Sequence, residues 1–117
     1  MSITIEMGLP DPALRPNGRA HWRVVAAAKK QAKGTALVLA LAAGDGTKWT
    51  AAMLDVVWFA KTKRYVPDDD NAWGSLKAAR DGIAAAIGID DKHVRQGVMR
   101  MDVDKARPRV QITVRPA

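Results

Sequence analysis

The chain of 117 residues contains no cysteine and only two histidines. Disulfides and thiolate metal ligands are therefore excluded, and two histidines are too few to favour a zinc site built from side chains. His21 and His93 also stand far apart in the sequence, which favours surface or helix-capping roles over catalysis. Any metal that this protein binds is expected to be held by oxygen atoms.

Long apolar runs are also missing, since no stretch reaches the roughly 20 residues that a membrane-spanning helix needs. The opening MSITIEMGLPDP holds a carboxylate and prolines where a signal peptide has a basic start and an apolar segment. We therefore expect a cytoplasmic protein with no membrane partner.

Positive charge, by contrast, is in excess. Lys and Arg number 19 against 12 Asp and Glu, which gives a formal net charge of +7 and an isoelectric point near 10.2. Such a balance favours a polyanionic partner such as nucleic acid. Hydrophobic residues make up 48% of the chain, as in folded proteins, and the length fits one domain over residues 1–117.

The first half of the chain predicts one strand and one long helix. Apolar and polar residues alternate over residues 3–7, which indicates a strand with one wet face. Residues 20–43 are rich in Ala, Leu, Lys and Gln and predict a long helix. Asn17 is a possible cap before this helix, and Gly44 follows it.

The second half predicts a buried strand and a second helix. Residues 51–60 carry apolar side chains on both faces, which is typical of a central strand. Asp55 interrupts this run, so we expect it to be paired or to lie at the sheet edge, in a structural role. A helix from about Asp70 to Ile87 is expected to end at Gly88.

The chain ends in two alternating segments, 99–103 and 110–114, joined by a turn at 105–108. This pattern predicts a terminal hairpin. The order strand, helix, strand, helix, hairpin predicts an α+β fold: one small domain with a mixed sheet of about four strands and two main helices.

Four aspartates flank the second predicted helix, with Asp68 and Asp70 at its start and Asp90 and Asp91 just beyond its end. Carboxylates at a helix start are stabilised by free N–H groups and the helix dipole, so a simple capping role is the plain alternative to a metal site. A helix of about 18 residues spans roughly 27 Å. Local spacing therefore does not bring the two pairs together.

The order of these residues resembles the RusA family of Holliday-junction resolvases, whose motif is Asp-x-Asp-Asn, then Lys, then Asp four residues on, then Asp-Asp. The matching residues here are Asp68-Asp69-Asp70-Asn71, Lys77, Asp81 and Asp90-Asp91. The opening LPDPALRPNGRAHWR and the predicted terminal hairpin also resemble that family, so the resemblance covers nearly the whole chain.

One departure concerns Lys77, because the family often has three residues fewer between its Asn and its Lys. Three residues make nearly one helical turn, so Lys77 keeps its face but moves about 4.5–5 Å along the axis. On a continuous helix Asp70, Gly74, Lys77 and Asp81 form one stripe. The alternative to a catalytic Lys77 is a surface ion pair with Asp81.

The resemblance implies a metal-dependent phosphodiesterase. Asp68, Asp70 and Asp91 would be the metal ligands, with Asp90 as an auxiliary carboxylate, and Lys77 would stabilise charge in the transition state. An all-oxygen site favours Mg²⁺, which Mn²⁺ can replace. The family also implies a homodimer in a bacterial or phage-infected cell, with two identical sites for the two strands that a junction presents.

Basic residues near the acidic motif are the DNA-binding candidates, because a cluster of carboxylates repels DNA unless positive charge surrounds it. Lys61, Lys63 and Arg64 lie directly upstream of the motif. A second basic group, suited to another DNA arm, comprises Arg15, Arg19, Arg23, Lys29, Lys30 and Lys33. Tyr65, Trp73 and Trp22 either stack on exposed bases or serve as packing residues, and the sequence assigns neither role.

The sequence thus predicts a magnesium-dependent endodeoxyribonuclease that resolves Holliday junctions by paired nicks in DNA recombination and repair. A nuclease for other branched DNA is one alternative, because fold and motif do not fix the substrate. A basic DNA-binding protein with a structural Asp cluster is the other, and it would bind DNA without cutting it.

Overall fold

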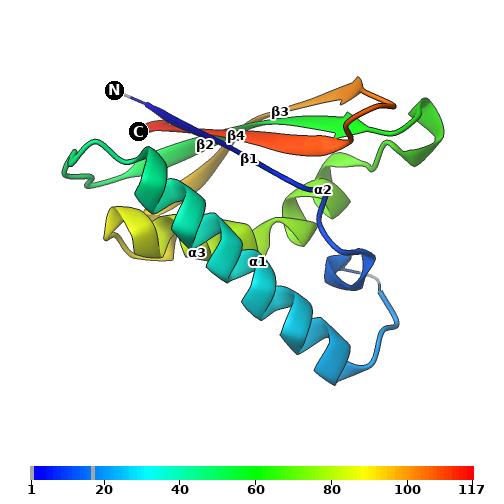
Figure 1. Ribbon diagram of the computed structural model, residues 1–117. Helices are drawn as coiled ribbons and strands as arrows, with labels where there is room; N and C mark the ends of the chain where they lie inside the picture. The colour runs from blue at the N-terminus through cyan, green and yellow to red at the C-terminus, as the bar shows by residue number, and fades with distance from the viewer. Residues whose placement is uncertain (1, 17) are drawn as a thin grey trace.

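The computed structural model describes residues 2–16 and 18–117, and Figure 1 shows its architecture. Four strands within these residues form one mixed sheet in the order β1-β4-β2-β3. The strands are β1 (Ile3–Met7), β2 (Ala52–Ala60), β3 (Val94–Val103) and β4 (Arg109–Pro116). The expected α+β class with a mixed sheet of about four strands is confirmed.

The terminal hairpin predicted from the sequence is wrong, because β2 lies between β3 and β4. Strand β3 runs parallel to β2, with Ala52 opposite Val94, and β4 runs antiparallel to β2 on its other side. Helices connect β2 to β3, and such a crossover is what parallel neighbours require. The short connection after β3 then passes the end of β2, where the Asp104 N–H donates to the Ala60 carbonyl at 2.8 Å.

The helices cover one face of the sheet, as Figure 1 shows for α1 and α3. The α-helices are α1 (Trp22–Ala43), α2 (Asp69–Ser75) and α3 (Lys77–Ile87), and short 3-10 turns form η1 (Pro12–Leu14), η2 (Lys63–Tyr65) and η3 (Asp91–His93). The helix predicted over residues 20–43 is therefore confirmed within two residues. Its cap is His21, whose Nδ1 accepts from the Arg23 N–H at 3.1 Å, whereas Asn17 lies outside the described residues.

The single helix predicted from Asp70 to Ile87 is two helices, broken at Leu76. Leu76 has φ −95° and ψ 3°, outside the α-helical region, and its side chain is buried. The two residues before it weaken the helix, since Gly74 has low helix propensity and the Ser75 hydroxyl donates to the Ala72 carbonyl at 2.9 Å. The predicted stripe through Asp70 and Lys77 is therefore not continuous. The predicted stop at Gly88 is confirmed, with a positive φ of 76°.

The core lies between the sheet and helices α1 and α3. Alternate residues of β2 point into it, from Ala52 to Ala60, and they meet Ile83 of α3 and Ala36 of α1. Helix α1 approaches α3 closely because Gly82 has no side chain: a Cβ there would overlap the Lys33 carbonyl oxygen. None of the helices in the described residues has the length and apolar character needed to cross a membrane.

Candidate functional site

The acidic motif forms the exposed first turn of α2. Asp68 is the cap, because its Oδ1 accepts from the Asn71 N–H at 2.8 Å. Asp69 and Asp70 follow in the first turn and are exposed, where the helix dipole stabilises their charges. The capping role considered for this motif therefore belongs to Asp68, while the Asp70 carboxylate makes no hydrogen bond to another described residue.

The second acidic pair begins η3. The Asp90 Oδ1 accepts from the Lys92 N–H at 3.1 Å. This hydrogen bond is the main reason that the pKa of Asp90 lies below its usual value. Both side chains are exposed.

The fold of the single chain holds the two acidic pairs apart. Asp90 and Asp91 precede Val94, which pairs with Ala52 at the beginning of β2, whereas Asp68 and Asp70 follow the end of that strand. Figure 1 shows α2 and α3 carrying the chain back across the sheet between these points. In the part of the chain that the structure describes, no three His, Asp or Glu side chains form a group that could hold a metal ion. The convergence of Asp68, Asp70 and Asp91 on one ion stays a prediction.

Lys77 lies at the start of α3 and reaches Asp81 one turn later, with 3.7 Å between Nζ and Oδ2. The ion pair considered as the alternative to a catalytic role is therefore present. The Lys77 side chain is 62% exposed and keeps its other donors free for solvent or an anion. The Asp81 Oδ1 is buried and has no hydrogen-bond partner among the described residues.

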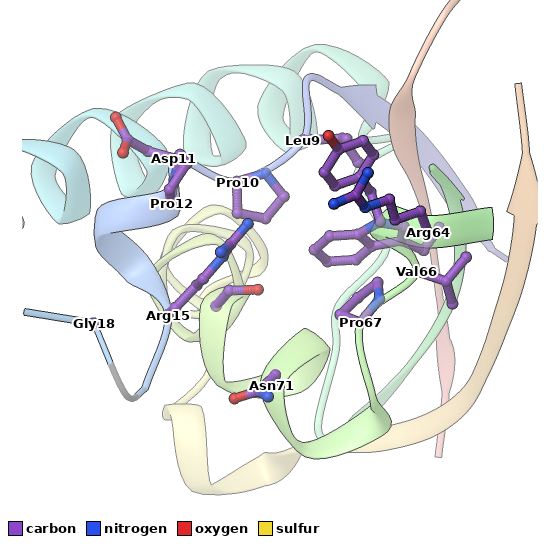
Figure 2. A pocket seen from close by; sticks show the side chains of 13 residues that line it. Leu9, Pro10, Asp11, Pro12, Arg15, Gly18, Arg64, Val66, Pro67 and Asn71 are labelled. Carbon is purple, nitrogen blue, oxygen red and sulfur yellow. The ribbon is translucent and has the colours of Figure 1, made fainter. Parts of the chain in front are cut away.

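A cavity of about 810 Å³ lies beside the Asp motif, and we call it the tyrosine cavity because Tyr65 lines it. Its walls come from four parts of the chain: the segment 9–12 with Arg15 and Gly18, Trp58 of β2, the segment 64–67, and Asn71 with Ser75 of α2. In Figure 2, Arg15 and Arg64 lie on opposite sides of the cavity and Asn71 projects from α2. The cavity thus reaches the residue that directly follows Asp70.

A second cavity, of about 690 Å³, lies between η1, the first half of α1 and the junction of α2 with α3. We call it the lysine cavity, since its cations are Arg15, Lys29, Lys30, Lys33 and Lys77. Asp81 is its one acidic lining residue. The two cavities share Arg15, Gly18 and Ser75, so Arg15 belongs to the lining of both.

Among five of the DNA-binding residues predicted from the sequence, two line these cavities and the other three are exposed elsewhere. Arg15 lines both cavities and Arg64 lines the tyrosine cavity. Lys61, Lys63 and Arg19 are exposed. Neither Arg15 nor Arg64 forms an ion pair with a carboxylate of the described residues, so their charge is available to an anion.

Sequence reasoning did not single out the cavity-lining roles of Trp58 and Pro10. Trp58 reads as an ordinary inward residue of a central strand, and the prolines around Pro10 read as the end of the first strand. From the sequence, Tyr65 is either a stacking or a packing residue, and Asn71 is part of the Asp motif. The cavity forms only because these four segments come together in the folded chain. No local sequence pattern indicates that they do.

Comparison with known proteins identifies a relative of this chain, but the description of that relative gives no activity. No protein-family model matches the chain. It is 38% identical over 112 residues to a protein of Xylella fastidiosa (strain Temecula1 / ATCC 700964) whose description reads "Uncharacterized protein". The match covers 90% of this chain and 71% of the Xylella protein. This identity and coverage place the chain in the same family as the Xylella fastidiosa protein.

Proposed function

We propose that this protein is a magnesium-dependent, structure-specific endodeoxyribonuclease of the RusA type that resolves Holliday junctions by paired nicks. One observation carries the proposal beyond the motif itself. The Asp68 to Asp70 turn is exposed at the start of α2, directly beside a cavity lined by two arginines that form no ion pair with described residues. Carboxylates thus lie beside a cavity whose two arginines have no carboxylate partner among the described residues, which supports the proposal.

The basic residues around α2 supply what DNA binding requires. A phosphate backbone is attracted by clustered Lys and Arg, and the binding free energy comes largely from release of counterions. Arg64 with Lys61 and Lys63 would contact the strand nearest to the Asp turn. The lysine cavity, with Lys29, Lys30 and Lys33 along one side of α1, would follow a neighbouring arm of the junction.

The carboxylates at the start of α2 suit magnesium chemically, since Mg²⁺ takes oxygen ligands and is commonly held by one or two carboxylates with several waters. The Asp68 cap uses Oδ1, which leaves Oδ2 for a ligand. When bound, magnesium supplies charge neutralisation at the phosphate and activation of water. Within one protomer Asp91 and Asp90 do not join this turn, so their assignment as ligands rests on the resemblance to the RusA family.

Lys77 is proposed to act from the lysine cavity, which it lines together with Asp81. Its ammonium group would offer positive charge to a DNA phosphate at the junction of α2 with α3. The ion pair with Asp81 would hold the side chain toward this cavity. A homodimer remains part of the proposal, because two identical sites related by a two-fold axis fit two symmetric nicks. Sedimentation of the purified protein tests it directly.

The experiment that tests the function is cleavage of a labelled four-way junction with Mg²⁺, with Mn²⁺ and with excess EDTA. We expect paired symmetric nicks with either metal and none in EDTA. A flap and a plain duplex of the same sequence serve as controls, and preferential cutting of the flap would favour a nuclease for other branched DNA. Binding without cutting at any magnesium concentration would overturn the enzymatic proposal in favour of a DNA-binding protein.

A further inference from the structure

We propose that the tyrosine cavity binds one unpaired nucleotide of the DNA, with its base stacked on Tyr65 and its phosphates held by Arg15 and Arg64. This inference rests on the proposed binding of branched DNA and names how a branch point would be distinguished from duplex. The proposed function uses the two arginines of this cavity as general phosphate contacts, and it gives no role to Tyr65 or to the enclosed space. The inference rests on the side chains that four separate segments of the chain bring together around the cavity.

The lining of the cavity combines three kinds of contact that a nucleotide uses. Tyr65 presents a flat ring, and 62% of its surface is exposed. Arg15 and Arg64 lie on opposite sides of the cavity (Figure 2), where guanidinium groups can hold phosphate oxygens in pairs. Asn71 adds an amide, which can both donate to and accept from the edge of a base.

A buried polar atom under this lining lacks a partner. The indole Nε1 of Trp58 is buried and makes no hydrogen bond within the described residues, although Trp58 itself is one of the lining residues. Buried N–H groups are normally satisfied, and an exception is often explained by a ligand or a water. The Trp58 side chain that lines the tyrosine cavity therefore carries a buried donor with no partner among the described residues.

The size and the fixed walls of the cavity also suit a small ligand. Its volume of about 810 Å³ lies in the range of about 300–1,000 Å³ that is typical of small-molecule sites. The η1 side is held against α2, since a Cβ at Gly74 would overlap the Pro16 ring. This close contact fixes Arg15, the neighbour of Pro16, relative to Asn71 on the same helix as Gly74.

Among the parts of a DNA molecule, an unpaired nucleotide fits such a cavity and a paired base does not. Bases inside a duplex are stacked and show only their edges in the grooves, so none can enter a recess between proline, tyrosine and asparagine side chains. At a branch point a base can leave the stack at lower cost, and stacking on an aromatic side chain then compensates for the loss. Because Asn71 directly follows Asp70, a nucleotide held there would bring its own backbone to the Asp turn.

Binding in EDTA tests this proposal separately from cutting. We would measure the affinity of the wild-type protein, Tyr65→Ala and Tyr65→Phe for a four-way junction and for a blunt duplex of matched length. The loss of one base stack predicts about 5-fold to about 150-fold weaker junction binding by Tyr65→Ala. Tyr65→Phe keeps the ring and should bind like the wild type. Duplex affinity should stay within about twofold for all three proteins.

A matched control is Trp22→Ala, because Trp22 is 68% exposed but lies outside both cavities. It should leave the difference between junction and duplex affinity unchanged. A 2-aminopurine at the branch point gives a second readout, with a fluorescence change on binding to the wild type and to Tyr65→Phe that is absent with Tyr65→Ala.

Three outcomes would overturn the proposal. An unchanged junction affinity of a folded Tyr65→Ala protein would remove Tyr65 from the interface. An equal loss on junction and duplex would make Tyr65 a general contact, with no nucleotide in the cavity. In both cases the proposed function would stand, whereas a wild-type protein that binds no DNA would overturn the proposed function and this inference together.

Discussion

The Asp55 carboxylate of β2 accepts a hydrogen bond from Arg115 Nε of β4 at 2.7 Å, and its other oxygen accepts one from the Val98 N–H of β3 at 2.9 Å. One side chain thus joins three neighbouring strands on the face of the sheet that the helices leave uncovered. Gly97 permits this contact, since a Cβ there would overlap the Asp55 carboxylate and crowd the Leu54 carbonyl. The expected structural, paired role of Asp55 is confirmed.

These contacts predict how stability depends on pH. The hydrogen bond from Arg115 is the main reason that the pKa of Asp55 lies below its usual value of 3.8, and the Val98 N–H lowers it further. A lowered pKa means that the ionised carboxylate stabilises the folded state at neutral pH, and that this contribution disappears as the pH falls below about 4. Asp55→Asn should therefore lower the melting temperature at pH 7 and matter progressively less below about pH 4. Melting curves of the wild type and Asp55→Asn from pH 2 to 8 test this prediction. A difference in melting temperature that grows toward acid pH would contradict it.

Replacement by alanine should have opposite effects on stability at two helical glycines, Gly82 of α3 and Gly34 of α1. Gly82→Ala should destabilise the protein by about 1–3 kcal/mol, because the added Cβ overlaps the Lys33 carbonyl oxygen and pushes α1 away from α3. Gly34→Ala is the control, since a Cβ there meets nothing within 4 Å and alanine favours the helix by up to about 1 kcal/mol. Denaturant unfolding of both variants measures the difference, and equal stabilities would show that α1 and α3 are not in close contact.

Asp70→Asn tests the catalytic assignment of the Asp turn. The cap is Asp68, so the substitution should change the free energy of unfolding by less than about 1 kcal/mol. Junction binding should hold or rise as a negative charge is removed, while magnesium should raise the melting temperature less and cutting should collapse. Asp69→Asn removes the same charge from the same turn and should still cut. Cutting at the wild-type rate by Asp70→Asn would refute the assignment.

The basic segment predicts a salt effect. Replacement of Lys61, Lys63 and Arg64 by Gln should reduce the slope of log K against log salt by up to ~2.7, at about 0.9 for each DNA phosphate that the variant no longer neutralises. A control with the same charge change replaces Lys48, Arg100 and Lys105, which are exposed and line neither cavity. Titrations of junction binding between low and moderate salt compare the two proteins. Equal slopes for both triple variants would exclude the segment from the DNA surface.

The sequence alone predicted where most elements lie. Alternation over residues 3–7 and the helical composition before Gly44 identified β1 and α1, because these patterns report which face of a segment is buried. The stop at Gly88 was also readable, since a helix end with positive φ favours glycine. The order of charged residues around Asp70 resembles the RusA family motif, and that resemblance, together with the excess of positive charge, raised the hypothesis of a nuclease.

The tertiary structure decided how these elements combine. Alternation in β3 and β4 does not say which strand lies beside each of them, and β2 took the place between them because the helical crossover put β3 at its parallel edge. The second predicted helix is interrupted at Leu76, whose side chain is buried in the core and whose backbone is not helical. The tyrosine cavity exists only where Pro10, Trp58, Tyr65 and Asn71 meet. Such contacts join residues far apart in the chain. They are stabilised by the packing of the whole domain, so the local preferences of a single segment do not predict them.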